Sequence, residues 1–526
     1  MSGFVFGIDL GTTNSACARA TVGDHRIDVM QIDPASSHDK TLLPSRILLR
    51  RNEDDGITCY VGRLAYQRHV EASSETDLYI EAAKREIGLQ KPQVWPFFGD
   101  LTLDPTDVAA LVLRKVVAEV TKTGVDSLQA VITHPRDFQS MQKAATAEAA
   151  VLAGIRLVET IDEPVAALYS WYRPDAPPEP GYYGVFDLGG GTLDIAIMEV
   201  RRNAHPVVIG GHGEPRLGGR DWDQVMYEQL ASSIRARYPS LDANSLDLRS
   251  QARLGELAEE LKREEGVVNH QRRVRLRTQV GQDVELDLQV TREVWSASAR
   301  GLVDRCRQAV GHALEQSNVQ PDQLKKLIPA GGGTRLRMVR DALKVMFGDR
   351  FLDPNQHPEI NLDHAIARGA ARFGSYLLAT SQQTARTAKL APITTTLAHG
   401  LNVEIEGNET KPLLTRGRTL PASEKKLFQV ASPGGLKVRI HEGEPGPLAE
   451  DAPCALDVGF DVQAELGDQV LVRVDAEHSG RISFVATHLR TGECRDGHLR
   501  YDGDGPTATN DLKTRRKKKL NSIKVL

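Results

Sequence analysis

The stretch around which this 526-residue chain is organised reads Asp187-Leu188-Gly189-Gly190-Gly191-Thr192-Leu193-Asp194. Val185 and Phe186 precede it and Ile195 to Met198 follow it, so a glycine run lies between two apolar segments. This pattern predicts a tight hairpin whose backbone can come close to a ligand. The amide N–H groups of such a glycine run, with no side chains in the way, form a nest for an anion such as phosphate.

The aspartates at the two ends of this hairpin indicate a metal ion. Asp187 and Asp194 flank the expected phosphate nest. A carboxylate beside a polyphosphate is repelled unless a divalent cation, most often Mg²⁺, lies between them. The stretch therefore predicts a hairpin that holds a metal-bound nucleotide.

A second copy of the motif occurs at the start of the chain. Phe4 to Ile8 is apolar, Asp9-Leu10-Gly11-Thr12-Thr13-Asn14-Ser15 follows, and Ala16-Cys17-Ala18 is apolar again. One glycine turn alone is also compatible with a structural hairpin that binds nothing. Two aspartate-flanked copies about one domain-length apart favour a duplicated, two-lobed fold in which each lobe supplies one phosphate hairpin.

The composition is typical of a globular protein of several domains. Hydrophobic residues make up 40% of the chain and charged residues 26%, which are ordinary values. The net charge of −4 argues against a general nucleic-acid binder. Five scattered cysteines indicate neither a disulfide framework nor a zinc site, and no apolar run is long enough to span a membrane. We therefore expect a cytoplasmic protein that begins without a signal peptide and binds neither membranes nor nucleic acid.

Strands alternate with helices over roughly the first 380 residues, which predicts α/β layers. Beyond the two hairpins, we expect strands at 27–32, 46–49, 130–133 and 157–158 and helices at 78–88, 108–121, 138–152, from 162, 225–237, 254–265, within 290–314 and at 361–376. Ile328 to Arg335 is a third strand–glycine–helix junction, where a phosphate or a flat ligand can approach the backbone.

The pattern changes to period-two alternation at Ile393, which predicts a separate all-β module. Strands are expected at 401–405, 427–430, 436–440, 470–474 and 482–486. The basic run from Lys513 to Lys519 is expected to be disordered. We divide the chain into lobe I (1–180), lobe II (181–380), a linker (381–392), the β domain (393–505) and a basic tail (506–526).

Taken together, these motifs resemble those of the heat-shock-seventy chaperone family, of the bacterial DnaK type, over about residues 1–505. Gly7 to Ser15 is similar to its first phosphate motif, Phe186 to Asp194 to its second, and Gly331 to Arg335 to its adenosine motif. The segments similar to its peptide-binding β-sandwich are 413–421, 427–428 and 470–492. The resemblance implies an α/β actin-like ATPase domain, duplicated in the ribonuclease-H-like manner, followed by an all-β sandwich.

The resemblance also implies catalytic roles. Asp9, Asp187 and Asp194 would hold Mg²⁺, largely through waters. Lys84 would orient the attacking water and neutralise γ-phosphate charge, with Glu163 close to metal and water. Such chemistry depends on positioning and charge neutralisation more than on a strong base. Without the resemblance, Lys84 is compatible with a solvated helix lysine and Glu163 with a helix-dipole partner.

The nucleotide contacts are carried over in the same way. Residues expected to cradle the phosphates are Thr12, Thr13, Gly189, Gly190, Gly191 and Thr192, the last also counted as catalytic. Gly11, Asn14, Gly218 and Gly219 are further expected nucleotide-binding residues. Residues expected around the adenosine are Glu259, Lys262, Arg263, Gly331, Gly332, Gly333 and Arg335, with Asp363 closing the site from below. The charged run that contains Glu259 is also typical of a solvated helix face.

Several positions depart from the family pattern. Asp162-Glu163-Pro164-Val165 stands where Asn-Glu-Pro-Thr is usual, and Gly333 stands where serine is common. Lys143 occupies the place of a relay arginine, and lysine cannot make the forked contacts of arginine. The linker around 384–392 is polar and basic, without the usual leucines and aspartate. Because the sequence ends soon after Tyr501, we expect a short form without the helical lid.

The leading hypothesis is an ATP-dependent, chaperone-like protein of low turnover. Hydrolysis of ATP would control how the β domain binds an unfolded or extended peptide, or a specific client protein, between Ile393 and Ile440. The resemblance implies ATP or ADP, Mg²⁺ and K⁺ as cofactors, and a J-domain co-chaperone and a nucleotide-exchange factor as partners. The alternative is a slow ATPase that acts as a nucleotide-dependent scaffold without refolding activity. A sugar or metabolite kinase on the same fold is weaker, because it does not explain the β module.

Overall fold

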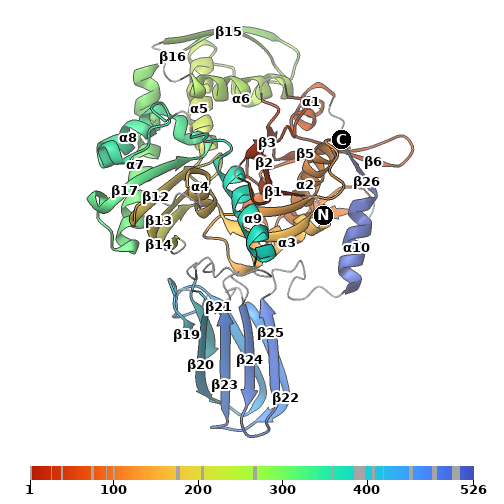
Figure 1. The fold of residues 1–526 in the computed structure, drawn as a ribbon. Helices are drawn as coiled ribbons and strands as arrows, with labels where there is room; N and C mark the ends of the chain where they lie inside the picture. The colour runs from red at the N-terminus through yellow and green to blue at the C-terminus, as the bar shows by residue number, and fades with distance from the viewer. Residues whose placement is uncertain are drawn as a thin grey trace.

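Two α/β lobes lie side by side, and an all-β domain extends from beneath them (Figure 1). The computed structural model describes residues 3–526 except for 25, 37–38, 73–75, 90–91, 99–100, 173–177, 203–205, 265–268, 358–359, 384–396, 398, 406–408, 419, 449–453, 477–481 and 500–509. Among the described residues, no helix combines the length and the apolar character needed to cross a membrane.

Lobe I is built on a mixed sheet with strand order β11-β10-β1-β2-β3, to which β4 adds beside β2. Its strands are β1 (Phe4–Asp9), β2 (Asn14–Thr21), β3 (Ile27–Val29), β4 (Leu42–Pro44), β10 (Gln129–His134) and β11 (Arg156–Asp162). A second sheet has the order β26-β6-β5-β7. Its strands are β5 (Arg46–Arg51), β6 (Ile57–Val61), β7 (Leu78–Glu81) and β26 (Ile523–Val525). The remaining elements are the hairpin β8 (Trp95–Pro96) and β9 (Thr102–Leu103) and the helices α1 (Arg63–Ala72), α2 (Pro105–Thr121), α3 (Ser140–Leu152) and α4 (Glu163–Trp171).

Lobe II repeats the strand pattern of lobe I. In lobe I, β1 pairs antiparallel with β2 and parallel with β10. In lobe II, β12 (Gly181–Leu188) pairs antiparallel with β13 (Leu193–Val200) and parallel with β17 (Leu324–Ala330), and β14 (Val207–Glu214) completes the sheet. Around it lie the hairpin β15 (Asn269–Arg277) and β16 (Asp283–Thr291) and the helices α5 (Gly219–Arg237), α6 (Leu248–Arg263), α7 (Arg292–Ser317), α8 (Arg337–Phe347) and α9 (Ala365–Gln383). This repeat matches the duplication expected from the two hairpin motifs.

The lobes are joined by helices α4 and α9, which pack closely because of a glycine. A Cβ atom on Gly369 of α9 would lie 1.7 Å from the carbonyl oxygen of Ala166 in α4. A Cβ on Gly7 of β1 would lie 2.1 Å from the backbone nitrogen of Ala371. Strand β1 therefore contacts α9, and α9 contacts α4, backbone to backbone. These contacts fix the base of the two expected phosphate hairpins.

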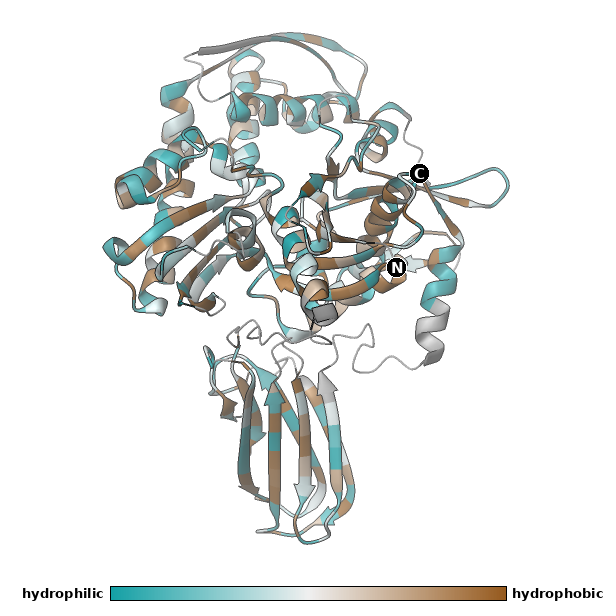
Figure 2. Cartoon of the chain, in the orientation of Figure 1, coloured by the Kyte–Doolittle hydropathy of each residue, from teal (hydrophilic) through white to brown (hydrophobic). Residues whose placement is uncertain are grey.

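The β domain consists of two four-stranded sheets, with orders β19-β18-β21-β22 and β20-β23-β24-β25. Buried residues alternate with exposed or half-buried ones along β23 and with half-buried ones along β24, and the inward side chains of both sheets share one core. Figure 2 shows this alternation in colour along the strands of the β domain. The strands are β18 (Leu401–Ile405), β19 (Glu409–Leu414), β20 (Ala422–Gln429), β21 (Gly434–Glu442), β22 (Cys454–Ala464), β23 (Gln469–Ala476), β24 (Ile482–His488) and β25 (Cys494–Leu499).

Two expectations from the sequence are wrong. Residues 78–88 are not one helix: β7 pairs with β5, and a short 3₁₀ turn, Ala83–Glu86, follows Ala82, whose left-handed backbone (φ 57°) ends the strand. The basic tail is not disordered where the structure describes it, because it forms α10 (Asn510–Asn521) and β26 against lobe I. Most of the predicted linker lies outside the described residues, and the domain boundaries at 180, 380 and 392 stay predictions.

Candidate functional site

A cleft of about 370 Å³ lies between the lobes and brings together most of the predicted site residues. The predicted residues that line it are Asp9, Gly11, Thr12, Thr13, Asn14, Lys84, Glu163, Asp187, Gly189, Gly190, Gly191, Thr192, Gly219, Glu259, Lys262, Arg263, Gly331, Gly332, Gly333, Arg335 and Asp363. Asp194 and Gly218 belong to the predicted set but are not among the residues that line this cleft. The functional roles of all the predicted site residues stay predictions, but the fold brings most of these residues together around one cleft.

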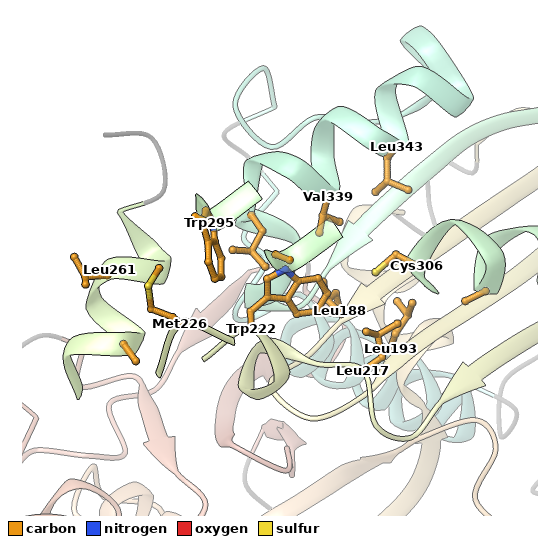
Figure 3. Packing of buried hydrophobic residues seen from close by; sticks show 14 of the residues in the cluster. Leu188, Leu193, Leu217, Trp222, Met226, Leu261, Trp295, Cys306, Val339 and Leu343 are labelled. Atoms are coloured by element: carbon orange, nitrogen blue, oxygen red, sulfur yellow. The ribbon is translucent and has the colours of Figure 1, made fainter. Parts of the chain in front are cut away.

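The second phosphate hairpin is anchored in the core of lobe II. Leu188 and Leu193, at its two ends, are fully buried and pack in the cluster that surrounds Trp222 (Figure 3). Leu217 is buried in the same cluster, immediately before Gly218. The glycine loops between these leucines are therefore held by packing rather than by their own side chains.

Three glycines from two turns meet this hairpin with no room for a side chain. A Cβ on Gly218 would lie 2.4 Å from the backbone nitrogen of Gly191, and one on Gly331 would lie 2.3 Å from the carbonyl oxygen of Leu188. A Cβ on Gly333 would lie 2.7 Å from Leu188 Cγ. The last contact explains why glycine occupies a position where serine is common in the resembling family.

The first hairpin reaches the second across the cleft. A Cβ on Gly190 would lie 2.2 Å from Thr13 Oγ1. Arg220 Nε donates to Thr13 Oγ1 at 3.2 Å, and the Arg85 guanidinium donates to the Gly191 carbonyl oxygen at 2.9 Å. Sequence reasoning did not single out these two arginines, although Arg85 follows Lys84 and Arg220 follows the Gly218-Gly219 pair. They place positive charge beside the phosphate loops.

Lys84 and Glu163 form a buried ion pair at the base of the cleft. Lys84 Nζ lies 2.6 Å from Glu163 Oε1, and each side chain is only 7% exposed. Lys84 is therefore not a solvated lysine. Asp9 lies in the same region and accepts a hydrogen bond from Thr133 at 3.2 Å.

The carboxylates around this pair have raised pKa values. Burial, followed by the charge of Glu163, raises the pKa of Asp9 to about 7 and that of Asp194 to about 8. Burial and the neighbouring carboxylates also hold the pKa of Asp187 well above its usual range. The main physical cause is desolvation by burial, and the charges of the neighbouring carboxylates, which Lys84 neutralises only in part, raise these pKa values further.

This excess negative charge fits a divalent cation. Asp187 Oδ1 is buried and has no hydrogen-bond partner in the described part of the chain. Within that same part, no three His, Cys, Asp or Glu side chains are grouped so that all could ligate one ion directly. Mg²⁺ commonly keeps several waters and takes few protein ligands. The residues therefore fit a hydrated Mg²⁺ held largely through waters, and the assignment of Asp9, Asp187 and Asp194 to this ion stays a prediction.

The side of the cleft where adenosine is predicted to bind is formed by α6 and the Gly331 turn. Lys262 Nζ lies 2.5 Å from Asp223 Oδ1 and donates to the carbonyl oxygen of Gly219 at 3.2 Å. Arg263 pairs with Glu259 at 2.5 Å but stays 69% exposed. Lys262 thus connects α6 to the loop at Gly219. Arg263 remains largely exposed to solvent, as expected for a residue on a charged helix face. Across the cleft, the Arg335 guanidinium pairs with Asp363 at 2.5 Å.

Two residues that depart from the family pattern, Lys143 and Asp162, form a charge pair with each other. Lys143 Nζ lies 3.7 Å from Asp162 Oδ1, and His134 Nδ1 lies 3.3 Å from the same oxygen. The aspartate replaces the usual asparagine, and the lysine replaces the usual arginine, so a charge pair forms at the start of α4. Asp137 is a further residue that sequence reasoning missed; its Oδ1 is buried without a partner among the described residues, and its charge helps to raise the pKa of Asp194.

The raised pKa values predict how stability depends on pH without ligand. Between pH 4 and 8, the folded protein binds more protons than the unfolded chain, because Asp9 and Asp194 titrate near 7 and 8 instead of 3.8. The free energy of unfolding should therefore fall as pH rises through this window. Mg²⁺-ADP, which replaces those protons with a cation, should raise the melting temperature more at pH 8 than at pH 6. Calorimetric melting curves at both pH values, with and without Mg²⁺-ADP, measure this; an equal shift at both would contradict it.

Comparison with known proteins shows the family to which the chain belongs. The family model described as Hsp70 protein matches residues 91–496. The chain is 29% identical over 510 residues to the chaperone protein DnaK of Thermosipho africanus, covering 93% of this chain and 79% of that protein. It is 28% identical over 507 residues to the chaperone protein DnaK of Thermotoga petrophila, with the same coverage. With the paired phosphate hairpins, the cleft between the lobes and the β domain already described, the chain belongs to the Hsp70 family.

Proposed function

We propose that this Hsp70-type protein hydrolyses ATP slowly in the cleft between its lobes and uses the nucleotide state to control binding of an extended peptide or client by its β domain. The observation that carries the proposal is the buried Lys84–Glu163 pair, which lies beside Asp9 and Asp187 at the meeting point of the phosphate hairpins. Membership of the Hsp70 family supports both the ATPase activity and the chaperone role.

Each group has a proposed part in the reaction. The backbone amides of the two hairpins bind the β- and γ-phosphates, with Thr12, Thr13 and Thr192 lining the same loops. Lys84 holds the attacking water and neutralises charge on the γ-phosphate, and Glu163 keeps the Lys84 ammonium in place at 2.6 Å. Asp9, Asp187 and Asp194 hold hydrated Mg²⁺, which supplies charge neutralisation when it is bound. Such a site acts by positioning and electrostatics, which suits a slow hydrolase.

Contacts between the β domain and the α/β lobes support the proposed coupling. Glu442 of β21 accepts hydrogen bonds from the backbone nitrogen of Ser140, at 2.8 Å, and from its hydroxyl. His399 Nε2 lies 3.0 Å from the Asp137 carbonyl oxygen. Ser140 begins α3, so Glu442 places a carboxylate from the β domain at a helix N-terminus of lobe I, a favourable site for negative charge. Asp137 in turn lies near Asp194, which connects this contact to the metal side of the cleft.

The test is single-turnover ATP hydrolysis with Mg²⁺ and K⁺, with and without an unfolded model peptide. In the wild type, we expect peptide to accelerate hydrolysis. Glu442→Gln should leave the basal rate unchanged and reduce the acceleration by about fivefold or more, since allosteric couplings of about 1–3 kcal/mol are typical. Glu444→Gln, at an exposed position two residues further along, is the matched control and should behave as wild type.

The outcomes separate the leading proposal from its alternative. Hydrolysis that peptide does not accelerate, in a wild type that binds ATP, would favour a slow ATPase acting as a nucleotide-dependent scaffold. Equal acceleration in wild type and Glu442→Gln would show that coupling does not pass through this contact. We also propose J-domain and nucleotide-exchange co-chaperones as partners, in the cytoplasm, on the strength of family membership.

A further inference from the structure

The C-terminal segment 510–526 returns to lobe I and completes one of its sheets. Strand β26 lies parallel to β6, with Ile523 opposite Ile57 and Val525 opposite Cys59. The Leu526 nitrogen donates to the Cys59 carbonyl oxygen at 2.9 Å, and the Val61 nitrogen donates to the Leu526 carbonyl oxygen at 3.2 Å. In Figure 1, α10 and β26 stand at the outer edge of lobe I, beside β6 and away from the β domain. The segment is thus attached by strand addition, in which main-chain hydrogen bonds give affinity and side-chain pockets give specificity.

Apolar side chains of the segment enter the lobe I core. Leu520 is fully buried and Ile523 is 4% exposed, and both belong to the same hydrophobic cluster as β6 and α2. Arg114 of α2 donates to the Leu520 carbonyl oxygen and, at 2.7 Å, to Asn521 Oδ1. The turn between α10 and β26 is therefore capped by lobe I.

An acidic cluster on lobe I receives the basic side chains. Arg516 pairs with Asp107 at 2.8 Å, with Glu148 at 3.1 Å and with Asp104 at 2.5 Å. Lys519 pairs with Asp107 at 2.6 Å. The Asp107 side chain is only 1% exposed. Networks of partly buried pairs with a forked arginine contribute specificity that isolated surface pairs lack.

This docking gives the β domain a second attachment. The chain leaves the α/β lobes after α9, passes through the β domain, and rejoins lobe I at α10. The ten residues 500–509 that connect β25 to α10 can span at most about 36 Å. A group held by two short connections has a high effective concentration, on the order of millimolar, at its binding surface.

We propose that lobe I carries a docking site for the basic, apolar C-terminal segment, and that this segment is a strap that keeps the β domain against the start of α3. The groove is formed by the free edge of β6, the apolar face of α2 and the acidic cluster Asp104, Asp107 and Glu148. The docking stands on the contacts alone, whereas its effect on peptide-stimulated hydrolysis rests on the proposed function.

The first test cuts the strap after folding. A site for a specific protease is inserted within 500–509 of the full-length protein, and the folded protein is cleaved without nucleotide. We expect the C-terminal fragment to stay bound to the body through gel filtration, while small-angle scattering shows a larger radius of gyration because the β domain has lost one attachment. A fragment that elutes separately would overturn the docking site. A retained fragment with an unchanged radius of gyration would show that the segment does not restrain the β domain. Elution as a dimer with exchanged segments would show that the segment docks on a second copy of the chain instead of its own.

The second test uses charge reversal with a matched control. Arg516→Glu/Lys519→Glu removes the pairs with the acidic cluster, whereas Lys517→Glu/Lys518→Glu makes the same charge change at exposed positions of the same helix. A fluorescein-labelled peptide of residues 510–526 should bind the first variant at least about 100-fold more tightly than the control or wild type, where the chain's own segment occupies the groove. Equal binding to all three would overturn the proposal. These readouts do not involve ATP, so they can fail independently of the proposed function.

Discussion

Replacing Lys84 by alanine is expected to slow single-turnover ATP hydrolysis by about 10²–10³-fold, the loss typical of removing one electrostatic stabiliser of a transition state. Lys84 lies 2.6 Å from Glu163, among the carboxylates Asp9, Asp187 and Asp194, whose pKa values are raised first by burial and then by the charge of Glu163. Without its ammonium group, charge that develops on the γ-phosphate would face these carboxylates with less compensation. Single-turnover hydrolysis with Mg²⁺ and K⁺ and an equilibrium titration of ATP binding separate the chemical step from affinity.

Stability must be measured beside activity, because the substitution leaves Glu163 buried without its partner. Breaking a buried ion pair from one side costs about 3–5 kcal/mol. The double variant Lys84→Ala/Glu163→Gln removes the uncompensated charge and should recover much of the stability while remaining slow. Lys122→Ala is the control, because Lys122 also pairs with a glutamate but is 66% exposed on lobe I. A folded Lys84→Ala protein that cleaves ATP at the wild-type rate would show that the catalytic assignment is wrong.

Replacing Gly331 by alanine is expected to destabilise the protein by about 2–5 kcal/mol, the sum of about 1–2 for a left-handed backbone and about 1–3 for overpacking. Gly331 has a φ of +73°, and a Cβ there would lie 2.3 Å from the Leu188 carbonyl oxygen and 2.4 Å from Asp187 Oδ1. Relief of these clashes must move the turn away from the phosphate hairpin. We therefore expect ADP affinity, measured by calorimetry with Mg²⁺, to fall by about tenfold or more, since each 1.4 kcal/mol corresponds to a factor of ten.

Gly255→Ala is the matched control for this prediction. Gly255 lies within α6, and a Cβ there would meet nothing within 4 Å. Alanine in a helix interior is favoured over glycine by about 0.8–1.0 kcal/mol, so this variant should unfold at slightly higher urea concentration than wild type. If Gly331→Ala unfolded at the wild-type midpoint and kept its ADP affinity, the close packing of the Gly331 turn on the hairpin would be refuted.

The sequence alone determined the features that depend on local pattern. The aspartate-flanked glycine runs at 9–15 and 187–194 predicted two phosphate hairpins, and both form between paired strands. Period-two alternation predicted the β domain, whose strands β23 and β24 alternate as expected. Glycine turns and side-chain periodicity are set by the chain's own backbone geometry, so they can be recognised without knowing what lies beyond a few residues.

Only the tertiary structure decided which distant residues become partners. Lys84 and Glu163 are 79 residues apart in the chain, and they pair because the fold of lobe I brings the 3₁₀ turn after β7 against the start of α4. The segment beginning at Leu78 looked helical but is β7, because pairing with β5 outweighs its local preference. The tail looked disordered because the run from Lys513 to Lys519 is strongly basic, and the partner that orders it is distant in sequence; Asp107 lies 409 residues before Arg516. Pairing over such separations depends on the assembled surface, which local composition does not specify.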